Sequence, residues 1–429
     1  MGNTSIITHP LKETLPFVLF FSAVWFICPI PCIFLFTLFL YKFQFSKQVE
    51  TCLLLFIAIS FGLIAYTTQS IGERPSDITR YNFIYSYIST VDSVQSFLIS
   101  FVIDGGNNVL FYLITFLMTR VFPNNPQVLP LFWVSVTYFF CFITIRQCAR
   151  YFKLARQTYI TLIFISFTGI ITFYTTTEVI KQTASISIFM YALMLKLQRK
   201  KGALLILMVS VLVHFSSMLL APIYFICNRY KVVRYLPAFL VVCIALSFFN
   251  FNVLLYNILS LFLGSKSDLL MRIQTYEDVE TWTISIRFYA LFAVYLLLVA
   301  ILYWDYYITQ NQHEKNNKKS LLIVHCFAAC LLLINRGNVH NFIRYILGYF
   351  PFYIVLVAQL FNMRIAKFDK KLLLAFVFAF YFFSNIKMIS AQTTSLDYGN
   401  SYMNNDIVKL FSSNVIQYLQ YRTNNDISN

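Results

Sequence analysis

Charged residues are scarce in this sequence: they make up 12% of its 429 residues, against about a quarter in a typical soluble domain. Together with a mean hydropathy of +0.68, this scarcity excludes an ordinary water-soluble enzyme. Nucleotide phosphate-binding loops, dinucleotide-binding glycine patterns and serine-hydrolase elbows are also missing, so ATP-driven transport and serine-hydrolase chemistry have no support. No cluster of residues has the spacing of metal ligands, and we expect neither a metal nor another cofactor.

Cysteine occurs in or at the edge of apolar stretches. Because the nine cysteines lie in or beside apolar stretches, the sequence predicts no disulfide framework. Two pairs, Cys28/Cys32 and Cys326/Cys330, are four residues apart and could share one helix face. We interpret the cysteines as small core residues.

Apolar residues, by contrast, form 59% of the chain and gather in runs that suit a membrane. We predict an all-α polytopic membrane protein with about 10–12 transmembrane helices in one integral membrane domain, residues 1–429. The first run, Leu15–Leu40, is too long for a signal peptide and is interpreted as a retained first helix. The runs fall near 14–41, 50–68, 107–122, 128–145, 157–175, 179–197, 202–227, 235–250, 283–304, 320–335, 341–362 and 372–392.

The interpretation of the net charge of +16 depends on where the basic residues lie in the chain. In a soluble protein such a charge would suggest a nucleic-acid partner. Here 20 of the 33 basic residues and 4 of the 17 acidic ones occupy six loops that can share one side. By the positive-inside rule that side is the cytoplasm, so we expect no nucleic acid. The six loops are 41–50, 146–156, 196–202, 228–234, 305–319 and 363–371.

This topology depends on two segments that do not span. The run 107–122 must lie along the interface, and 202–227 must enter and return as a re-entrant pair of half-helices around His214. The remaining runs then give ten full spans with both termini outside.

The opposite, non-cytoplasmic side receives loops in which acids and bases occur together: 69–127 with its interfacial helix, 251–282 and the tail 393–429. Because arginine binds phosphate bidentately and a carboxylate or histidine can take a proton from a hydroxyl, the set suits transfer chemistry on an anionic lipid-linked substrate. A solvated or paired loop charge is the alternative for each residue singly, and a hydrogen-bonded core histidine is the alternative for His214. The loop residues are Glu73, Arg74, Asp77, Arg80, Glu178, Lys181, Arg272, Arg287, Arg336, His340 and Arg344.

Three short motifs give the chain a family resemblance. Asp77-Ile-Thr-Arg-Tyr81 has an Asp followed four residues later by a Tyr, Lys181-Gln182-Thr183-Ala184 is similar to an Arg-Gln-x-x-Ala helix start, and His214-Phe215-Ser216 fits His-x-Ser. In this order and spacing the chain resembles the EpsG-like branch of bacterial polysaccharide polymerases, which includes O-antigen polymerases of the Wzy type. Two departures are Lys181 in place of Arg, which loses the bidentate fork, and the absence of the Gly usual before the Asp.

The resemblance implies a polymerase in the bacterial inner membrane with its active face in the periplasm. Such an enzyme moves a growing glycan from undecaprenyl pyrophosphate to the non-reducing end of a new lipid-linked repeat unit. It needs no nucleotide, and its fold resembles the GT-C type with a juxtamembrane helix. The partners implied are the undecaprenyl-pyrophosphate-linked oligosaccharide, the lipid bilayer, and a chain-length regulator and flippase of the same pathway.

Roles follow as hypotheses at residue level. Asp77 is the favoured base, with Glu73 second, and Glu178 orients Lys181, which is a cation for the leaving pyrophosphate. His214 supports the re-entrant hairpin or the floor of the site. The candidate pyrophosphate clamps are Arg80, Arg272, Arg336 and Arg344, and the further substrate-binding candidates are Arg74, Tyr81, Gln182, Arg287 and His340.

Three rival functions remain open. A GT-C transferase that adds one sugar from a polyprenyl-phosphate donor needs the same kind of Asp and Arg. A ligase that joins finished polymer to its final lipid is another enzyme of this kind. A flippase or exporter of lipid-linked oligosaccharide is not an enzyme, and it needs cations along a path through the bilayer.

Overall fold

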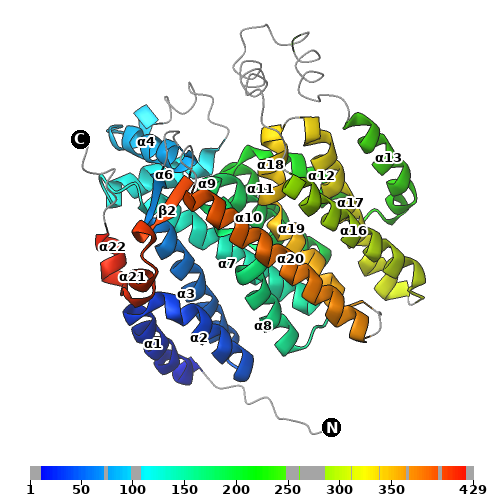
Figure 1. Ribbon diagram of the computed structural model, residues 1–429, viewed down its shortest axis with the longest axis horizontal. Coiled ribbons are helices and arrows are strands. Elements are labelled where there is room, and N and C mark those ends of the chain that lie inside the picture. The colour runs from blue at the N-terminus through cyan, green and yellow to red at the C-terminus, as the bar shows by residue number, and fades with distance from the viewer. Residues whose placement is uncertain are drawn as a thin grey trace.

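The computed structural model is built almost wholly of helices (Figure 1). It describes residues 11–71, 76–97, 108–247, 260, 286–310, 312–337, 339–363, 367–394 and 399–421. In this part of the chain four helices are long and apolar enough to cross a membrane, and a bent pair brings the number to five. The prediction of an all-α polytopic membrane protein is confirmed.

The N-terminal half begins with α1 (Leu11–Ile27), α2 (Pro29–Lys42) and α3 (Lys47–Tyr66). Strand β1 (Thr68–Ile71) and the short helices α4 (Asp77–Ser89) and α6 (Val109–Val121) follow. The chain continues with α7 (Val128–Tyr151), α8 (Arg156–Ile165), the π-helix η1 (Ser166–Ile170), α9 (Phe173–Glu178) and α10 (Ile180–Leu197). Residues 175–178, which separate the apolar runs 157–175 and 179–197, thus form the end of α9.

The second half begins with α11 (Ala203–Val213), the 3-10 helix η2 (Phe215–Leu220) and α12 (Ala221–Ile226), then η3 (Tyr230–Tyr235) and α13 (Leu236–Leu246). After it come α16 (Ile286–Ile308), α17 (Gln312–Ile334), η4 (Asn335–Gly337), α18 (Val339–Gly348), α19 (Phe350–Phe361) and α20 (Lys367–Thr394). The tail forms β2 (Gly399–Tyr402), η5 (Met403–Asn405), α21 (Ile407–Ser412) and α22 (Val415–Gln420).

The centre of the bundle is α7, which packs against α3, α10 and α19. Gly62 of α3 permits the close approach to α7, because a Cβ at this position would lie 2.0 Å from Ser135 Oγ and 2.5 Å from the Leu131 carbonyl oxygen. Phe61 of α3 stacks on Tyr138 of α7 with ring centroids 4.0 Å apart. A buried apolar core joins these helices, while α20 crosses one side of the bundle (Figure 1).

The basic loops meet at one end of this bundle, as their charge predicted. Glu50, at the start of α3, lies 3.7 Å from Arg146 near the end of α7. The Lys200 ammonium donates to Gln147 Oε1 at 2.7 Å. Further contacts join Tyr151 to Asn317 at 3.5 Å and Ser320 to Asn228 at 3.4 Å. Five of the six predicted loops therefore share what we call the basic end.

The first apolar run is not one helix, which corrects the prediction. It breaks at Cys28, whose backbone is non-helical (φ −142°, ψ 72°) before Pro29, since a residue preceding proline avoids the α region. The two halves fold back on each other, because Phe21 of α1 lies 5.6 Å from Phe39 of α2. Phe17 lies 6.4 Å from Phe45, so α1 begins at the basic end. The expectation that both termini lie on the opposite side is therefore wrong for the N-terminal end.

A second unexpected break divides the run 341–362. Helices α18 and α19 meet at Tyr349 at an angle of 45°, and Pro351 stands in the first turn of α19. The predicted break in 202–227 is confirmed at His214, whose backbone is extended (φ −152°, ψ 122°). Helix α6 has 13 residues, short for a span; its place along the interface stays a prediction.

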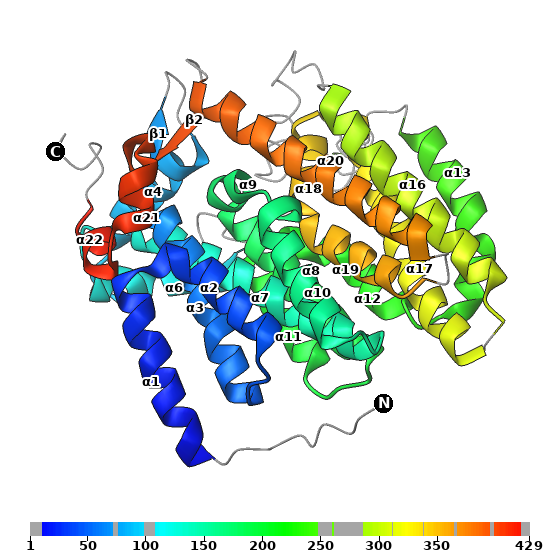
Figure 2. The same cartoon turned by 60° about the horizontal axis from the view of Figure 1, so that its bottom comes forward.

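The polar end opposite the basic loops joins distant parts of the chain. Strand β1, which directly follows α3, pairs antiparallel with β2 of the tail, with Thr68 opposite Tyr402. The Tyr66 hydroxyl at the end of α3 donates to the Leu419 carbonyl oxygen at 3.0 Å. In Figure 2 this end, marked by β1, β2 and α9, faces upward.

Candidate functional site

An ion pair between Asp77 and Arg344 is the centre of the candidate site. Asp77 is the first residue of α4 and Arg344 lies in α18, and Arg344 Nη2 donates to Asp77 Oδ2 at 2.8 Å. The Asp77 side chain is 20% exposed and that of Arg344 29% exposed. The pair is therefore firmly oriented and still open to a ligand from solvent.

Glu178 lies on the other side of Asp77. Its Oε2 accepts a hydrogen bond from the backbone N–H of Asp77 at 3.1 Å, so this carboxylate caps the N-terminus of α4, where negative charge is favourable. Its Oε1 accepts from the side-chain amide of Asn400 in β2. Glu178 is only 4% exposed, and these donors satisfy a buried charge that would otherwise be costly.

Lys181 projects into a group of aromatic rings. Its ammonium nitrogen lies 5.5 Å from the ring centroid of Tyr81, 5.1 Å from that of Phe111 and 5.5 Å from that of Tyr112. Such rings stabilise a cation through their negative faces. Because Lys181 is the second residue of α10, its charge adds to the positive end of that helix dipole. This position concentrates positive potential beside the Asp77–Arg344 pair.

Tyr81 connects the two parts of the cluster. Burial raises the pKa of its hydroxyl well above the usual value, and the carboxylates of Asp77 and Glu178 act in the same direction. Arg344 and Arg80 oppose the shift. The phenol therefore remains protonated and available as a hydrogen-bond donor or acceptor.

His214 lies at the tip of the hairpin formed by α11, η2 and α12. Its Nδ1 accepts from the backbone N–H of Ser216 at 3.2 Å, and the charges of Lys181 and Arg344 act on its ring. The backbone N–H of Phe215 donates to Asn108 Oδ1 at 3.1 Å, which ties the hairpin to the start of α6. His214 therefore lies close to the cluster, within a hairpin that is joined to the start of α6.

The structure brings together six of the predicted residues: Asp77, Tyr81, Glu178, Lys181, His214 and Arg344. Gln182 is buried beside Gly348 at the end of α18, the helix that carries Arg344. Arg80 has an exposed side chain that acts on Tyr81.

Arg336 lies apart on the side of α16, with its guanidinium carbon 5.8 Å from the ring centroid of Tyr289. The remaining predicted positions are outside the described residues: Glu73, Arg74, Arg272, the loop 251–282 apart from residue 260, and the side chains of Arg287 and His340.

Asn400 was missed by the sequence interpretation, although it completes the coordination of Glu178. It lies in the tail, over 200 residues further along the chain, and no local motif marks it. Only the pairing of β1 with β2 brings it to the site.

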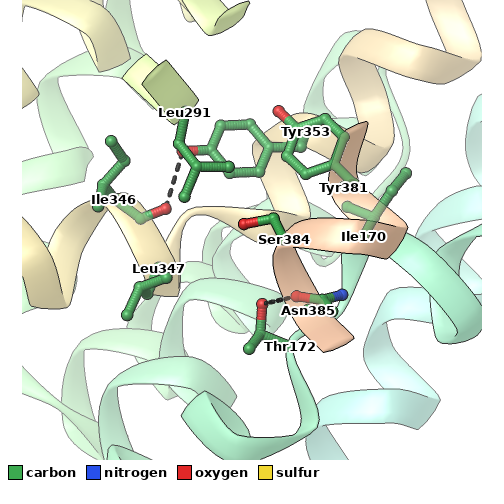
Figure 3. Close-up of a pocket in the computed structure, with 9 residues that line it drawn as sticks. All are labelled: Ile170, Thr172, Leu291, Ile346, Leu347, Tyr353, Tyr381, Ser384 and Asn385. Atoms are coloured by element: carbon green, nitrogen blue, oxygen red, sulfur yellow. Dashed lines mark hydrogen bonds between the residues drawn. The ribbon is translucent and has the colours of Figure 1, made fainter. Parts of the chain in front are cut away.

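A narrow cavity lies beside the cluster, between η1, α18, α19 and α20 (Figure 3). The Thr172 hydroxyl donates to Asn385 Oδ1 at 2.7 Å, and the Tyr353 hydroxyl donates to the Ile346 carbonyl oxygen at 2.8 Å. The volume of the cavity is about 10 Å³, roughly the space of one water molecule. The cavity is too small for a sugar and is not a substrate pocket in this conformation.

The described part of the chain contains no set of side chains that could bind a metal ion. Across those residues, three or more His, Cys, Asp or Glu side chains nowhere come close enough to hold an ion. What the cluster offers is a partly exposed carboxylate, a buried one, two cations and a protonated phenol.

Comparison with known proteins gives one match. The family model described as EpsG family matches residues 52–402, which is most of the chain and includes every residue of the cluster. No curated protein and no solved structure matches.

Proposed function

The chain belongs to the EpsG family, and from this membership and the charged cluster we propose that it is a polysaccharide polymerase of O-antigen type. It transfers a growing glycan from undecaprenyl pyrophosphate to the non-reducing end of a new lipid-linked repeat unit. The active face is the polar end of the bundle, on the periplasmic side of the bacterial inner membrane.

The Asp77–Arg344 pair is the observation that carries this proposal. Transfer needs a base for the acceptor hydroxyl and a cation for the pyrophosphate, and the pair presents both within 2.8 Å, partly open to solvent. The hydroxyl oxygen attacks the anomeric carbon of the growing glycan as its bond to the pyrophosphate oxygen breaks. Asp77 accepts the hydroxyl proton, and undecaprenyl pyrophosphate leaves, its charge stabilised by Arg344 and Lys181.

Glu178 and Tyr81 support this chemistry indirectly. Glu178 fixes the first residue of α4 and so the position of Asp77, while remaining buried away from the acceptor. Tyr81 walls the site next to Lys181 and, as a protonated phenol, can donate a hydrogen bond to a sugar or phosphate oxygen.

The location of charge favours transfer over flipping. In the described parts of the bundle, ion pairs are found towards the two ends: Glu50 with Arg146 and Asp305 with Lys318 near the helix ends of the basic end, and Asp77 with Arg344 at the polar end. A flippase requires cations along the path of the pyrophosphate through the bilayer.

A gene deletion complemented with variants tests the proposal. Deletion should leave lipid capped by a single repeat unit, and the wild-type gene should restore the glycolipid ladder on a gel. Asp77→Asn should fail to restore it, while Asp92→Asn, a matched change at an exposed residue after the same helix, should restore it fully.

The rival functions give different patterns in the deletion strain. Complete absence of the repeat would indicate a flippase or ligase, and a full ladder of altered mobility would indicate a transferase that adds one sugar. Either pattern would overturn the polymerase proposal.

A further inference from the structure

A pocket at the basic end lies between the loop 196–202 and the hairpin of α11 and α12. It is far from the Asp77 cluster, at the opposite end of α10, and is an open depression with a volume of about 330 Å³. This volume is within the range of small-ligand sites. Its lining residues are Lys196, Arg199, Lys200, Gly202, Ala203, Leu204, Tyr224 and Asn228.

The pocket has a strongly positive wall. Three of its eight lining residues are cations, and none is an acid. Burial lowers the pKa of Lys200, and the neighbouring cations Arg150, Lys47 and Arg146 lower it further. Those three cations lie outside the pocket wall, whose own positive charge comes from Lys196, Arg199 and Lys200; an anion bound among these three is attracted by all of them.

The N-terminus of α11 forms another part of the wall. Gly202 is the N-cap of this eleven-residue helix, and it provides no side-chain cap for the first N–H groups. Its backbone has φ +83°, and a Cβ placed there would meet no atom within 4 Å, so open space lies directly before the helix. Uncapped N–H groups and the helix dipole favour a phosphate at such a position.

The surroundings of the pocket distinguish a lipid from a free anion. Three apolar side chains of α11 next to the pocket are exposed on the surface: Leu204 at 53%, Leu205 at 64% and Met208 at 55%. Together they extend an apolar strip along the helix, starting at the pocket. A phospholipid could place its anionic head group among the cations and its acyl chains along this apolar strip. Both the charged pocket and the exposed apolar face would then be covered by one molecule.

We propose that this pocket binds the phosphate head group of an anionic phospholipid, with its acyl chains lying along the exposed face of α11. Arg199 and Lys200 contact the phosphate, and the α11 N-terminus donates backbone hydrogen bonds to it. Lys196 is held 5.2 Å from the ring centroid of Tyr224 and forms the inner side of the site. The proposal is independent of the polymerase assignment.

Native mass spectrometry of the full-length protein in detergent tests this site, with phosphatidylglycerol as the probe. The double variant Arg199→Gln/Lys200→Gln should bind it about 30-fold more weakly, since each basic residue near an anionic membrane surface contributes roughly fivefold in affinity. The matched control is Lys201→Gln/Lys231→Gln, which removes the same charge from two exposed residues of the basic end that do not line the pocket. It should bind phosphatidylglycerol like the wild type.

Two further arms identify the ligand. Phosphatidylcholine should bind the wild-type protein weakly and equally in both double variants, and millimolar inorganic phosphate should not displace phosphatidylglycerol. Equal loss of phosphatidylglycerol in both double variants would overturn the site, because general surface charge would then explain binding. Full displacement by inorganic phosphate would overturn the lipid as the ligand. Melting temperatures without added lipid check that the variants remain folded.

Discussion

A double-mutant cycle on Asp77 and Arg344 separates a catalytic carboxylate from a merely structural one. The three variants are Asp77→Asn, Arg344→Gln and the double. The ion pair has an N···O distance of 2.8 Å, but its side chains are 20% and 29% exposed. Water screens such a pair, so its contribution to the free energy of unfolding is about 1 kcal/mol. The melting temperature of each single variant should therefore fall by no more than about 2–4 °C.

The expected loss of activity is far larger than this loss of stability. Removing a general base reduces the rate by about 100- to 10,000-fold, which corresponds to about 3–5 kcal/mol in the activation barrier. A protein that is about 1 kcal/mol less stable is still almost entirely folded. Loss of the ion pair alone thus cannot account for a rate reduction of this size.

The assay is polymerisation of purified lipid-linked repeat units by wild-type and variant protein in detergent, followed on a gel. Melting temperatures are measured on the same samples. If Asp77 acts only by holding Arg344, the double variant will be no slower than Arg344→Gln alone. If Asp77 is the base, Asp77→Asn will be slow whether or not Arg344 is present. Normal chain growth by Asp77→Asn would refute the reasoning.

Four other predictions concern the cluster, the helix packing and the topology. Glu178→Gln should lower the free energy of unfolding, measured by thermal melting, by about 1–3 kcal/mol. The carboxylate accepts hydrogen bonds from the Asp77 backbone N–H and the Asn400 side-chain amide, and the amide nitrogen of glutamine would face one of these donors without being able to accept from it. Lys181→Arg should retain polymerisation, since it keeps the positive charge, whereas Lys181→Met should lower kcat by roughly tenfold, because the leaving pyrophosphate loses a stabilising cation. Gly62→Ala should cost about 1–3 kcal/mol through overpacking of α3 on α7, while Gly348→Ala, where the nearest atom is 3.6 Å from the new Cβ, should melt like the wild type. A reporter that fluoresces only in the cytoplasm should be bright when fused ahead of α1 and dark when fused after Asn429.

Segment properties were predictable from the sequence. Hydropathy located the helices because burial in lipid or in the bundle acts on a whole run of residues. Loop charge predicted that the basic loops lie together, and contacts such as those of Glu50 with Arg146, Lys200 with Gln147 and Tyr151 with Asn317 bring five of them to one end. The resemblance selected Asp77, Lys181 and His214, whose motifs are local.

Breaks within apolar runs were harder to predict, because hydropathy does not report them. The break at Cys28 had a local signal in the prolines that follow it, Pro29 and Pro31, since the residue before a proline avoids the helical region. The break at Tyr349 is also followed by a proline, Pro351. At both places the helix axis changes direction, although the apolar run continues without a polar residue to mark the break.

Partners within the site were not predictable at all, because they depend on contacts between distant segments. Asp77 and Arg344 are 267 residues apart, and Glu178 and Asn400 are 222 apart. The charges in the sequence indicate only that acidic and basic residues are equal in number outside the six basic loops. Which acid faces which base is decided by the packing of α4 against α9 and of α18 against α10.

The two ends of the bundle therefore hold charge in opposite ways, and this difference bears on how each binds a ligand. At the polar end Arg344 already has a carboxylate partner and Lys181 already has aromatic ones, so an anionic substrate must compete with them. Such competition weakens binding of the ground state, but the cations remain oriented for charge that develops on the leaving group. At the basic end, by contrast, no acid lines the pocket of Arg199 and Lys200, and the partner of Lys200 is the neutral amide oxygen of Gln147, so an anion there competes with no negative charge of the pocket wall. The first arrangement suits turnover, and the second suits retention of a lipid.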